Sequence, residues 1–352
     1  MDLKSKLNHI RRKVMHGLIK YVSFSDTKMQ RGKEIDVKRV LLCRPNSRLG
    51  NQLLITPLVQ DITTLFPDCK IDLFVRGGLS ELIFEKYKQV DRIIKLPKKP
   101  FCELIKYIKG WLSLRKLSYD LVVNVAESSF SGRLSTRFAH AKWRFYNNTN
   151  LALQARYPDY RHMAKSPVYN LRYYLSQSGM KVVPQEPVPS LDIKLSHAER
   201  EDAQRLLESF VDPTKKKTIC IYTYATGAKC YPENWWAVMY KRLQKAFGGT
   251  YNIVEILPIE HVSQIHFQTP TYYSQNIREI ASFISNTMLF FGADSGITHL
   301  AAAAGVPTVG LFSITDIAVY QPYGNHSMAI DTNTIKTKEI IAILRELLND
   351  IE

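Results

Sequence analysis

The chain has 352 residues, enough for two domains of ordinary size, and 45% of them are hydrophobic, as in a globular protein with real cores. No apolar run approaches the length of a membrane span, and the N-terminus lacks the apolar core and cleavage site of a signal peptide. Five scattered cysteines without a C-x-x-C pair argue against a disulfide framework and favour reduced thiols in a cytoplasm. The net charge of +16 calls for an acidic partner such as a nucleic acid, an anionic membrane or a phosphorylated substrate.

The first 36 residues are predicted to be a basic amphipathic extension. Apolar residues recur at helical spacing over residues 1–22, with Lys and Arg mostly between them, which is typical of a helix at a membrane surface. A helix that packs on its own protein, or a partly disordered tail, fits the same composition. We found no zinc-finger, RRM or aromatic-interleaved basic motif, so nucleic acid is not the expected partner.

From residue 37 the chain alternates between predicted strands and helices. Strands are expected at 37–45, 70–76, 90–96 and 119–126, with helices between them. This alternation predicts a parallel sheet covered by helices. Residues 182–192 hold three prolines and are predicted to link two domains.

A second alternation follows, with strands expected at 217–225 and 251–258 and a last helix at the C-terminus. Its most informative part is FFGADSGITHLAAAAGVPTVGLF, residues 290–312. The pattern predicts a strand, a tight turn at Asp294–Gly296, a short helix that ends before Gly305, and another strand. The turn thus lies at the carboxyl end of a strand, where open α/β sheets bind ligands.

Three stretches in this order resemble glycosyltransferase family nine, which contains the bacterial heptosyltransferases. They are RPNSRLGNQLLITPLVQDI (44–62), YTYATGAKCYPENWWAVMYKRL (222–243) and the stretch around Asp294. The resemblance implies an α/β GT-B fold with two Rossmann-like domains whose parallel sheets face a cleft. We expect an acceptor-side domain at 37–185, a nucleotide-sugar-binding domain at 186–335 and a C-terminal helix at 336–352.

The resemblance also implies an inverting glycosyltransferase that uses no metal or other cofactor and takes a nucleotide-diphospho-sugar as co-substrate. The sugar is expected to go, possibly as heptose in line with the family, to lipopolysaccharide or a related surface glycolipid. The sequence has no D-x-D pair, with which other glycosyltransferases hold a divalent ion. The expected location is cytoplasmic, peripheral on the inner face of the cytoplasmic membrane, with residues 1–22 against anionic lipid.

Lys229 matches the family lysine and is the first candidate to neutralise the leaving diphosphate. Backbone N–H groups near Gly296 are expected to bind phosphate at the start of a helix. The candidate substrate-binding residues are Ser47, Gly50, Thr223, Thr226, Lys229, Glu260, Asp294, Ser295, Gly296 and His299. For Thr223, Thr226 and Glu260, a structural role in a turn or loop stays equally open.

The base is where the chain departs from the family. Asn51 stands where the family pattern has Asp, and an amide cannot take a proton at neutral pH. Glu127, which follows the strand expected at 119–126, is the best replacement by position, although it also suits a turn cap. Asn51 and Glu127 are therefore the catalytic candidates, and a catalytically inactive sugar-nucleotide or membrane-lipid binding protein of the same fold is the alternative.

Overall fold

The computed structural model describes residues 36–99, 102–177, 180, 182, 187–209, 211–215 and 217–351. The predicted membrane-binding residues 1–22 lie outside this part. The chain forms two compact units. The N-terminal unit comprises residues up to Ser47, Pro57–Glu81 and Tyr87–Pro189, and the C-terminal unit comprises Arg48–Thr56, Leu82–Lys86 and the chain from Ser190 onward.

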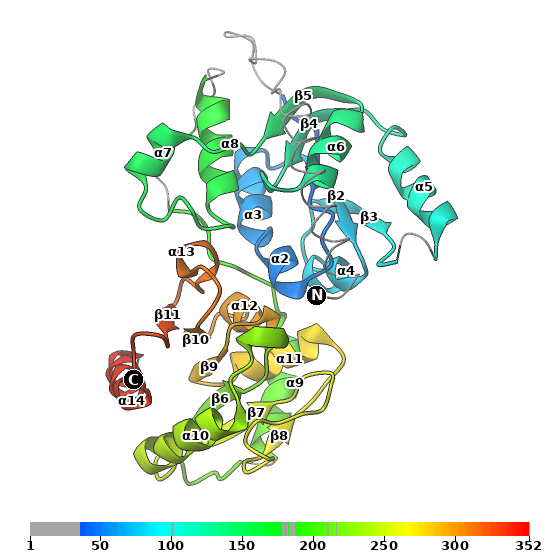
Figure 1. The fold of residues 1–352 in the computed structure, drawn as a ribbon. Coiled ribbons are helices and arrows are strands. Elements are labelled where there is room, and N and C mark those ends of the chain that lie inside the picture. Colours follow the sequence, from blue (N-terminus) through cyan, green and yellow to red (C-terminus); the bar gives the residue numbers. More distant parts are fainter. Residues whose placement is uncertain are drawn as a thin grey trace, which may run out of the picture. The chain divides into compact units, whose positions relative to one another are not determined.

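The N-terminal unit is built on a five-stranded, all-parallel sheet with the order β3-β2-β1-β4-β5 (Figure 1). The strands are β1 (Arg39–Cys43), β2 (Lys70–Arg76), β3 (Val90–Leu96), β4 (Tyr119–Asn124) and β5 (Ala141–Tyr146). The helices are α3 (Thr56–Leu65), α4 (Leu79–Ile83), which runs across the border between the units, α5 (Leu104–Ser113), α6 (Phe130–Phe138), α7 (Leu151–Arg156) and α8 (Ser166–Gln177).

The C-terminal unit is built on a six-stranded, all-parallel sheet with the order β11-β10-β9-β6-β7-β8. The strands are β6 (Thr218–Tyr222), β7 (Asn252–Ile256), β8 (Thr271–Tyr272), β9 (Leu289–Ala293), β10 (Thr308–Phe312) and β11 (Met328–Asp331). The helices are α2 (Leu49–Leu53), α9 (His197–Glu208), the 3₁₀ helix η1 (Gly227–Lys229), α10 (Glu233–Phe247), α11 (Ile277–Ser285), α12 (Gly296–Ala303), α13 (Ile317–Tyr320) and α14 (Thr337–Ile351).

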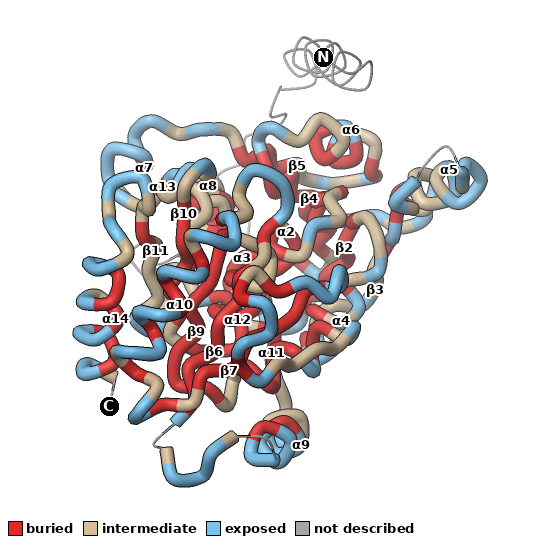
Figure 2. The backbone as a smooth tube through the Cα atoms, turned by 60° about the horizontal axis from the view of Figure 1, so that its bottom comes forward, coloured by how far each residue is buried: buried red, intermediate tan, exposed pale blue. Residues whose placement is uncertain are grey.

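The strands of both sheets carry the buried cores, drawn red in Figure 2. β1, β6, β9 and β10 are almost wholly apolar and buried, as expected for parallel strands covered on both faces. In the C-terminal unit the fully buried Trp236 of α10 meets Phe291 of β9 edge to face, with ring centroids 6.0 Å apart. These contacts fix the strand ends from which the loops of the site emerge.

Both sheets have the Rossmann arrangement. The chain builds outward from the first strand to one edge and then returns to the other side of that strand, so the order reverses between β1 and β4 and between β6 and β9. Ligands of such sheets bind at the carboxyl ends of the strands beside this reversal. The loops after β1, β4, β6 and β9 are therefore the places to look for a site.

Among the helices of the described ranges, none combines the length and the apolar character that crossing a membrane requires.

Candidate functional site

The loops that follow β6 and β9 bring together two of the predicted side chains. Lys229 lies in η1 and Asp294 directly follows β9, and Lys229 Nζ is 2.6 Å from Asp294 Oδ2. The Asp294 side chain is buried, whereas that of Lys229 is 38% exposed. An ammonium group has three N–H donors, so Lys229 can bond Asp294 and an incoming anion at the same time.

This ion pair borders a pocket of about 590 Å³ that lies wholly within the C-terminal unit. It takes residues from α2, from η1 and the residue before it, from the start of α12, and from the loop and helix after β10. The lining residues are Arg48, Leu49, Gly50, Asn51, Leu54, Thr226, Lys229, Asp294, Ser295, Gly296, His299, Thr315 and Tyr320. Seven of the predicted residues and the catalytic candidate Asn51 thus share one pocket.

The start of α12 differs in detail from the expectation. Ser295 is the N-cap of α12, and its Oγ accepts a hydrogen bond from the backbone N–H of Ile297 at 3.2 Å. That N–H was expected to bind phosphate, but here the cap satisfies it, as N-cap serines commonly do. Ser295 Oγ lies 3.4 Å from Thr298 Oγ1, which is a long contact, so the Ser295 hydroxyl can still donate to a ligand.

Gly296 has a role that the sequence did not predict. It was expected to let phosphate approach the backbone, but a Cβ on Gly296 would lie 3.0 Å from Leu49 Cβ and 3.3 Å from Gly50 N. A Cβ on Gly50 would in turn lie 2.6 Å from Cδ2 of His299. The two glycines therefore allow α2 and α12 to pack closely, which places Asn51 in the same pocket as Lys229.

His299 lies one turn into α12 and is buried. The pKa of His299 is lowered to about 4, mainly by burial and to a smaller extent by the nearby Lys229, while Asp294 acts in the opposite direction. Its Nδ1 has no hydrogen-bond partner among the described residues. The imidazole is therefore neutral at pH 7 and can donate or accept a hydrogen bond in the pocket, but it adds no positive charge.

The structure does not bring Thr223, Glu260 or Ser47 into this pocket. The Thr223 hydroxyl donates to the buried carboxylate of Glu255 and accepts the backbone N–H of Gln264 at 3.1 Å, so it is engaged in holding the loops together. Glu260 is exposed and pairs with the hydroxyl of Tyr224. Ser47 is half-buried and is the last residue of its segment of the N-terminal unit.

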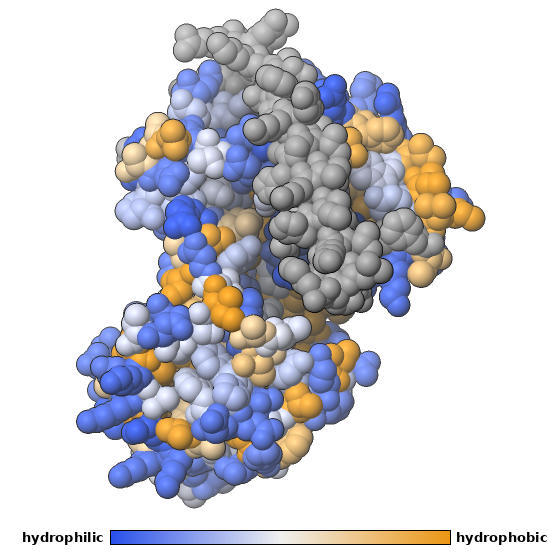
Figure 3. Space-filling model, viewed as in Figure 1, coloured by the Kyte–Doolittle hydropathy of each residue, from blue (hydrophilic) through white to orange (hydrophobic). Residues whose placement is uncertain are grey.

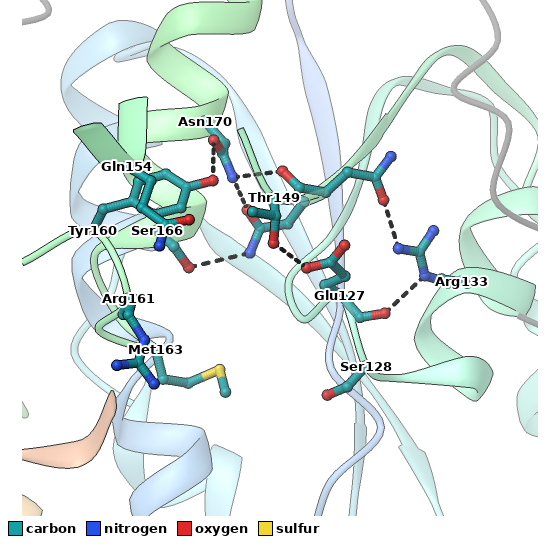
Figure 4. Close-up of a pocket in the computed structure, with 12 residues that line it drawn as sticks. Glu127, Ser128, Arg133, Thr149, Gln154, Tyr160, Arg161, Met163, Ser166 and Asn170 are labelled. Atoms are coloured by element: carbon teal, nitrogen blue, oxygen red, sulfur yellow. Dashed lines mark hydrogen bonds between the residues drawn. The ribbon is translucent and has the colours of Figure 1, made fainter. Parts of the chain in front are cut away.

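The N-terminal unit has a pocket of its own, of about 730 Å³, which contains Glu127 (Figure 4). Its residues follow β4 and β5 and continue through α7 to the start of α8. Glu127 is exposed, and its Oε2 accepts a hydrogen bond from Thr149 Oγ1 at 2.6 Å. The two catalytic candidates therefore line different pockets, and among the residues lining the first one the single carboxylate is Asp294.

Amide groups hold the second pocket in shape. Asn170 Nδ2 donates to Asn147 Oδ1 at 2.6 Å and to the carbonyl oxygen of Asn148 at 3.1 Å, while Tyr160 donates its hydroxyl to Asn170 Oδ1 at 2.9 Å (Figure 4). Because each of these bonds joins loop residues to α8 or its preceding turn, the polar wall is fixed before any ligand binds.

Arg133 supplies the buried charge of this second pocket. Its Nε donates to the carbonyl oxygen of Glu127 at 2.8 Å and its Nη2 donates to Asn148 Oδ1 at 2.5 Å, but its Nη1 has no partner among the described residues. Burial lowers the pKa of Arg133, yet a guanidinium stays protonated in proteins. A buried cation with an unused N–H group is suited to an anionic or hydroxyl-rich ligand.

Sequence reasoning missed several lining residues. Arg48, Thr315 and Tyr320 were not predicted for the first pocket, nor Arg133 for the second. Arg48 lies inside a motif that was recognised, and Thr315 follows β10 at the carboxyl end of its sheet, so the rule on strand ends would have found it. Arg133 lies inside α6, where no sequence signal marks it as different from a surface arginine.

No group of three or more His, Cys, Asp or Glu side chains in the described part of the chain is placed to hold a metal ion.

Known proteins resemble this chain over most of its length. Lipopolysaccharide heptosyltransferase 1 of Campylobacter coli is 24% identical over 351 residues, covering 86% of this chain and 97% of that protein. Lipopolysaccharide heptosyltransferase 3 of Escherichia coli (strain K12) is 23% identical over 299 residues, covering 78% and 82%.

Solved structures show the same fold. The glycosyl transferase family 9 protein from Veillonella parvula DSM 2008 matches with a TM-score of 0.69 at 19% identity, covering 90% of this chain and 99% of that one. The E. coli heptosyltransferase WaaC with ADP matches with a TM-score of 0.63 at 18% identity, covering 88% and 99%. With the two parallel sheets, this confirms the predicted α/β GT-B class with two Rossmann-like units. The family model described as Glycosyltransferase family 9 (heptosyltransferase) matches residues 108–342, more than half of the chain, and the chain therefore belongs to this family.

Proposed function

We propose that this protein is an inverting, metal-independent glycosyltransferase that moves a sugar from a nucleotide-diphospho-sugar to lipopolysaccharide or a related surface glycan. Heptose is the first candidate sugar, since the similar proteins are named as lipopolysaccharide heptosyltransferases. The observation that carries the proposal is the Lys229–Asp294 pair beside the strand-order reversal of the C-terminal sheet.

The donor is assigned to the pocket of the C-terminal unit. Lys229 faces the diphosphate and stabilises the negative charge that grows on it as the sugar leaves, with Arg48 as a second cation. The hydroxyls of Thr226 and Ser295 add hydrogen bonds, and neutral His299 adds another. A phosphate repels a carboxylate, so Asp294 is not assigned to the diphosphate. Instead it positions Lys229 and accepts hydrogen bonds from sugar hydroxyls.

The chemistry is a single displacement. The acceptor hydroxyl oxygen forms a bond to the anomeric carbon, the bond from that carbon to the diphosphate oxygen breaks, and the hydroxyl proton passes to a base. Attack opposite the leaving group inverts the anomeric centre. Asn51, in the donor pocket, orients the acceptor hydroxyl, and Glu127 is the proposed base.

The pocket around Glu127 and Arg133 is assigned to the acceptor. Its fixed amides suit sugar hydroxyls, and the unused N–H of Arg133 suits an anionic group of a surface glycolipid. We place the enzyme in the cytoplasm, peripheral on the inner face of the cytoplasmic membrane, with residues 1–22 against anionic lipid. A catalytically inactive sugar-nucleotide or membrane-lipid binding protein is the second candidate, favoured by the amide of Asn51 at a position where the family pattern has a carboxylate.

A thermal-shift panel of nucleotide sugars tests the donor site. A bound donor at a hundredfold excess over its Kd stabilises the folded protein by about 2.7 kcal/mol. Lys229→Ala is expected to weaken donor binding about ten- to a hundredfold through lost charge-assisted hydrogen bonds. Lys241→Ala, at an exposed lysine on α10, is the matched control.

Equal donor affinities of Lys229→Ala and Lys241→Ala would show that Lys229 does not bind the donor. Sugar transfer to lipopolysaccharide then separates the two candidate functions, because a binding protein shows the thermal shift without turnover.

A further inference from the structure

The outer face of α5 exposes a row of large aliphatic side chains. Leu104, Ile105, Ile108 and Leu112 are between 48% and 70% exposed. At 100° per residue they fall within one 100° arc of the helix, so they form a continuous stripe. Figure 3 shows the corresponding orange patch over α5, which Figure 2 draws as exposed and intermediate.

The face of α5 next to this stripe anchors the helix to its unit. Trp111 meets Phe74 at 5.4 Å and Phe138 at 6.0 Å between ring centroids, both edge to face. Tyr107 packs against the same core, and a Cβ on Gly110 would lie 2.9 Å from Leu96, so the helix sits close to the sheet. The helix packs through this neighbouring face, and the apolar stripe stays exposed beside it.

Basic residues surround the stripe. Residues 98–116 contain six Lys or Arg and a single acid, Glu103, which pairs with Lys106 at 2.7 Å. Lys109 lies next to the stripe on the helix surface, and Lys98, Lys99, Arg115 and Lys116 are exposed at the two ends. A short apolar stripe with lysines along its border is the composition of helices that lie in the plane of a membrane surface.

We propose that α5 is a docking surface for an anionic lipid bilayer, with the four aliphatic side chains inserted and the basic residues against the headgroups. A second copy of the chain fits this face poorly, because pairing two α5 helices would bring two positively charged borders together. The proposal goes beyond glycosyl transfer and needs no donor, so it can fail while the proposed function stands. It also rests on residues other than 1–22.

Vesicle binding by the full-length protein tests the proposal. The vesicles contain phosphatidylcholine with about a third phosphatidylglycerol, and pure phosphatidylcholine vesicles serve as the uncharged reference. The double variant Ile105→Asp, Ile108→Asp is expected to partition at least about tenfold less, because two apolar side chains no longer insert. Val238→Asp, at an exposed valine of α10, is the matched control and should partition like the unaltered protein.

Lys109→Gln separates charge from insertion and should not disturb folding, since the side chain is exposed. It is expected to lower partitioning to the anionic vesicles about fivefold, the effect of one basic residue near such a surface, and to leave the uncharged vesicles unaffected. Wild-type partitioning of both α5 variants would overturn the proposal. So would a dimer in sedimentation velocity that the double variant abolishes, since the stripe would then serve a second copy.

Discussion

The two units have the same strand order around their first strand, yet the pockets at their strand ends differ in chemistry. In the C-terminal unit the loops after β6 and β9, together with α2, bring together an ion pair, a neutral histidine and two closely packed glycines. In the N-terminal unit the loops after β4 and β5 bring together amides, Glu127 and the buried Arg133. The topology thus determines where each pocket lies, and the loop sequences determine what it can bind.

Charge separates the two pockets further. Lys229 is balanced by Asp294 and keeps donors for an anion, whereas Arg133 is buried with Nη1 unused among the described residues. The pair of Lys229 and Asp294 suits a ligand group whose charge changes during the reaction, because the partly exposed ammonium group of Lys229 can move towards that charge. The buried Arg133 suits a group with fixed polarity, because its donors are already held in place.

The largest expected effect concerns which pocket holds the base. If Glu127 takes the acceptor proton, Glu127→Gln should lower kcat about 10²- to 10⁴-fold, the usual contribution of a general base. The glutamine keeps the oxygen that accepts from Thr149, so the loop should stay in place. Donor affinity, measured by thermal shift, should hardly change, because Glu127 does not line the donor pocket.

Two further variants sharpen this test. Asp294→Asn removes the carboxylate of the donor pocket and should weaken donor binding through the loss of the Lys229 pair. Asn51→Asp should raise the rate only if the position still has the geometry of a base. Suppose that Glu127→Gln transfers sugar at the unaltered rate, while Asp294→Asn still binds the donor but transfers no sugar. The base would then lie in the donor pocket and not at Glu127.

Much of the fold could be predicted from periodicity. The run from Met288 to Phe312 predicts strand, turn, helix and strand, and the structure has β9, the turn, α12 and β10 there. Gly305, expected after the helix, has φ of 84°, which favours glycine. The elements from α6 to α8 were not predicted, since β5 is a half-exposed edge strand and α7 is only six residues long.

The sequence predicted site residues only where a recognised motif lies at the carboxyl end of a predicted strand. Lys229, Asp294 and His299 belong to such motifs and share one pocket. The engagement of Thr223 with Glu255 depends on a residue 32 positions away, and the packing of Gly50 on His299 depends on one 249 positions away. A sequence pattern carries no information on such long-range contacts, so these roles needed the structure.

The next effect concerns the buried titratable group of the donor pocket. The pKa of His299 is about 4 in the folded chain against an ordinary value near 6.5, so the unfolded chain binds its proton first as the pH falls. Above pH 6.5 the titration of His299 therefore does not lower the free energy of unfolding. As the pH falls from 6.5 towards 4, it lowers this free energy by about 3 kcal/mol in total.

Denaturant unfolding at several pH values between 7.5 and 4.5 measures this slope, and His299→Gln should flatten it. His140, which lies exposed in the N-terminal unit and bonds Ser118, is the matched control, and His140→Gln should leave the slope in place. An equal slope in all three proteins would show that His299 titrates normally and that its pocket is wetter than the structure indicates.

The smallest effect tests whether α2 belongs to the donor pocket. In Gly50→Ala the new Cβ would lie 2.6 Å from Cδ2 of His299, closer than such contacts occur, so the helices must separate or the ring must move. Overpacking of this kind costs about 1–3 kcal/mol of unfolding free energy. Gly249→Ala is the control in the same unit, because nothing lies within 4 Å of a Cβ there, and it should change stability by no more than about 0.5 kcal/mol.

Donor affinity then shows which part of the pocket has moved. If α2 shifts away from α12, Arg48 and Asn51 leave the pocket with it while Lys229 and Asp294 stay, so the donor should bind more weakly although its ion pair is intact. If Gly50→Ala keeps both the stability and the donor affinity of Gly249→Ala, then α2 is not held against α12 in solution. Asn51 would then have no place in the donor pocket, and the contrast between the two pockets would rest on the loops after β6 and β9 alone.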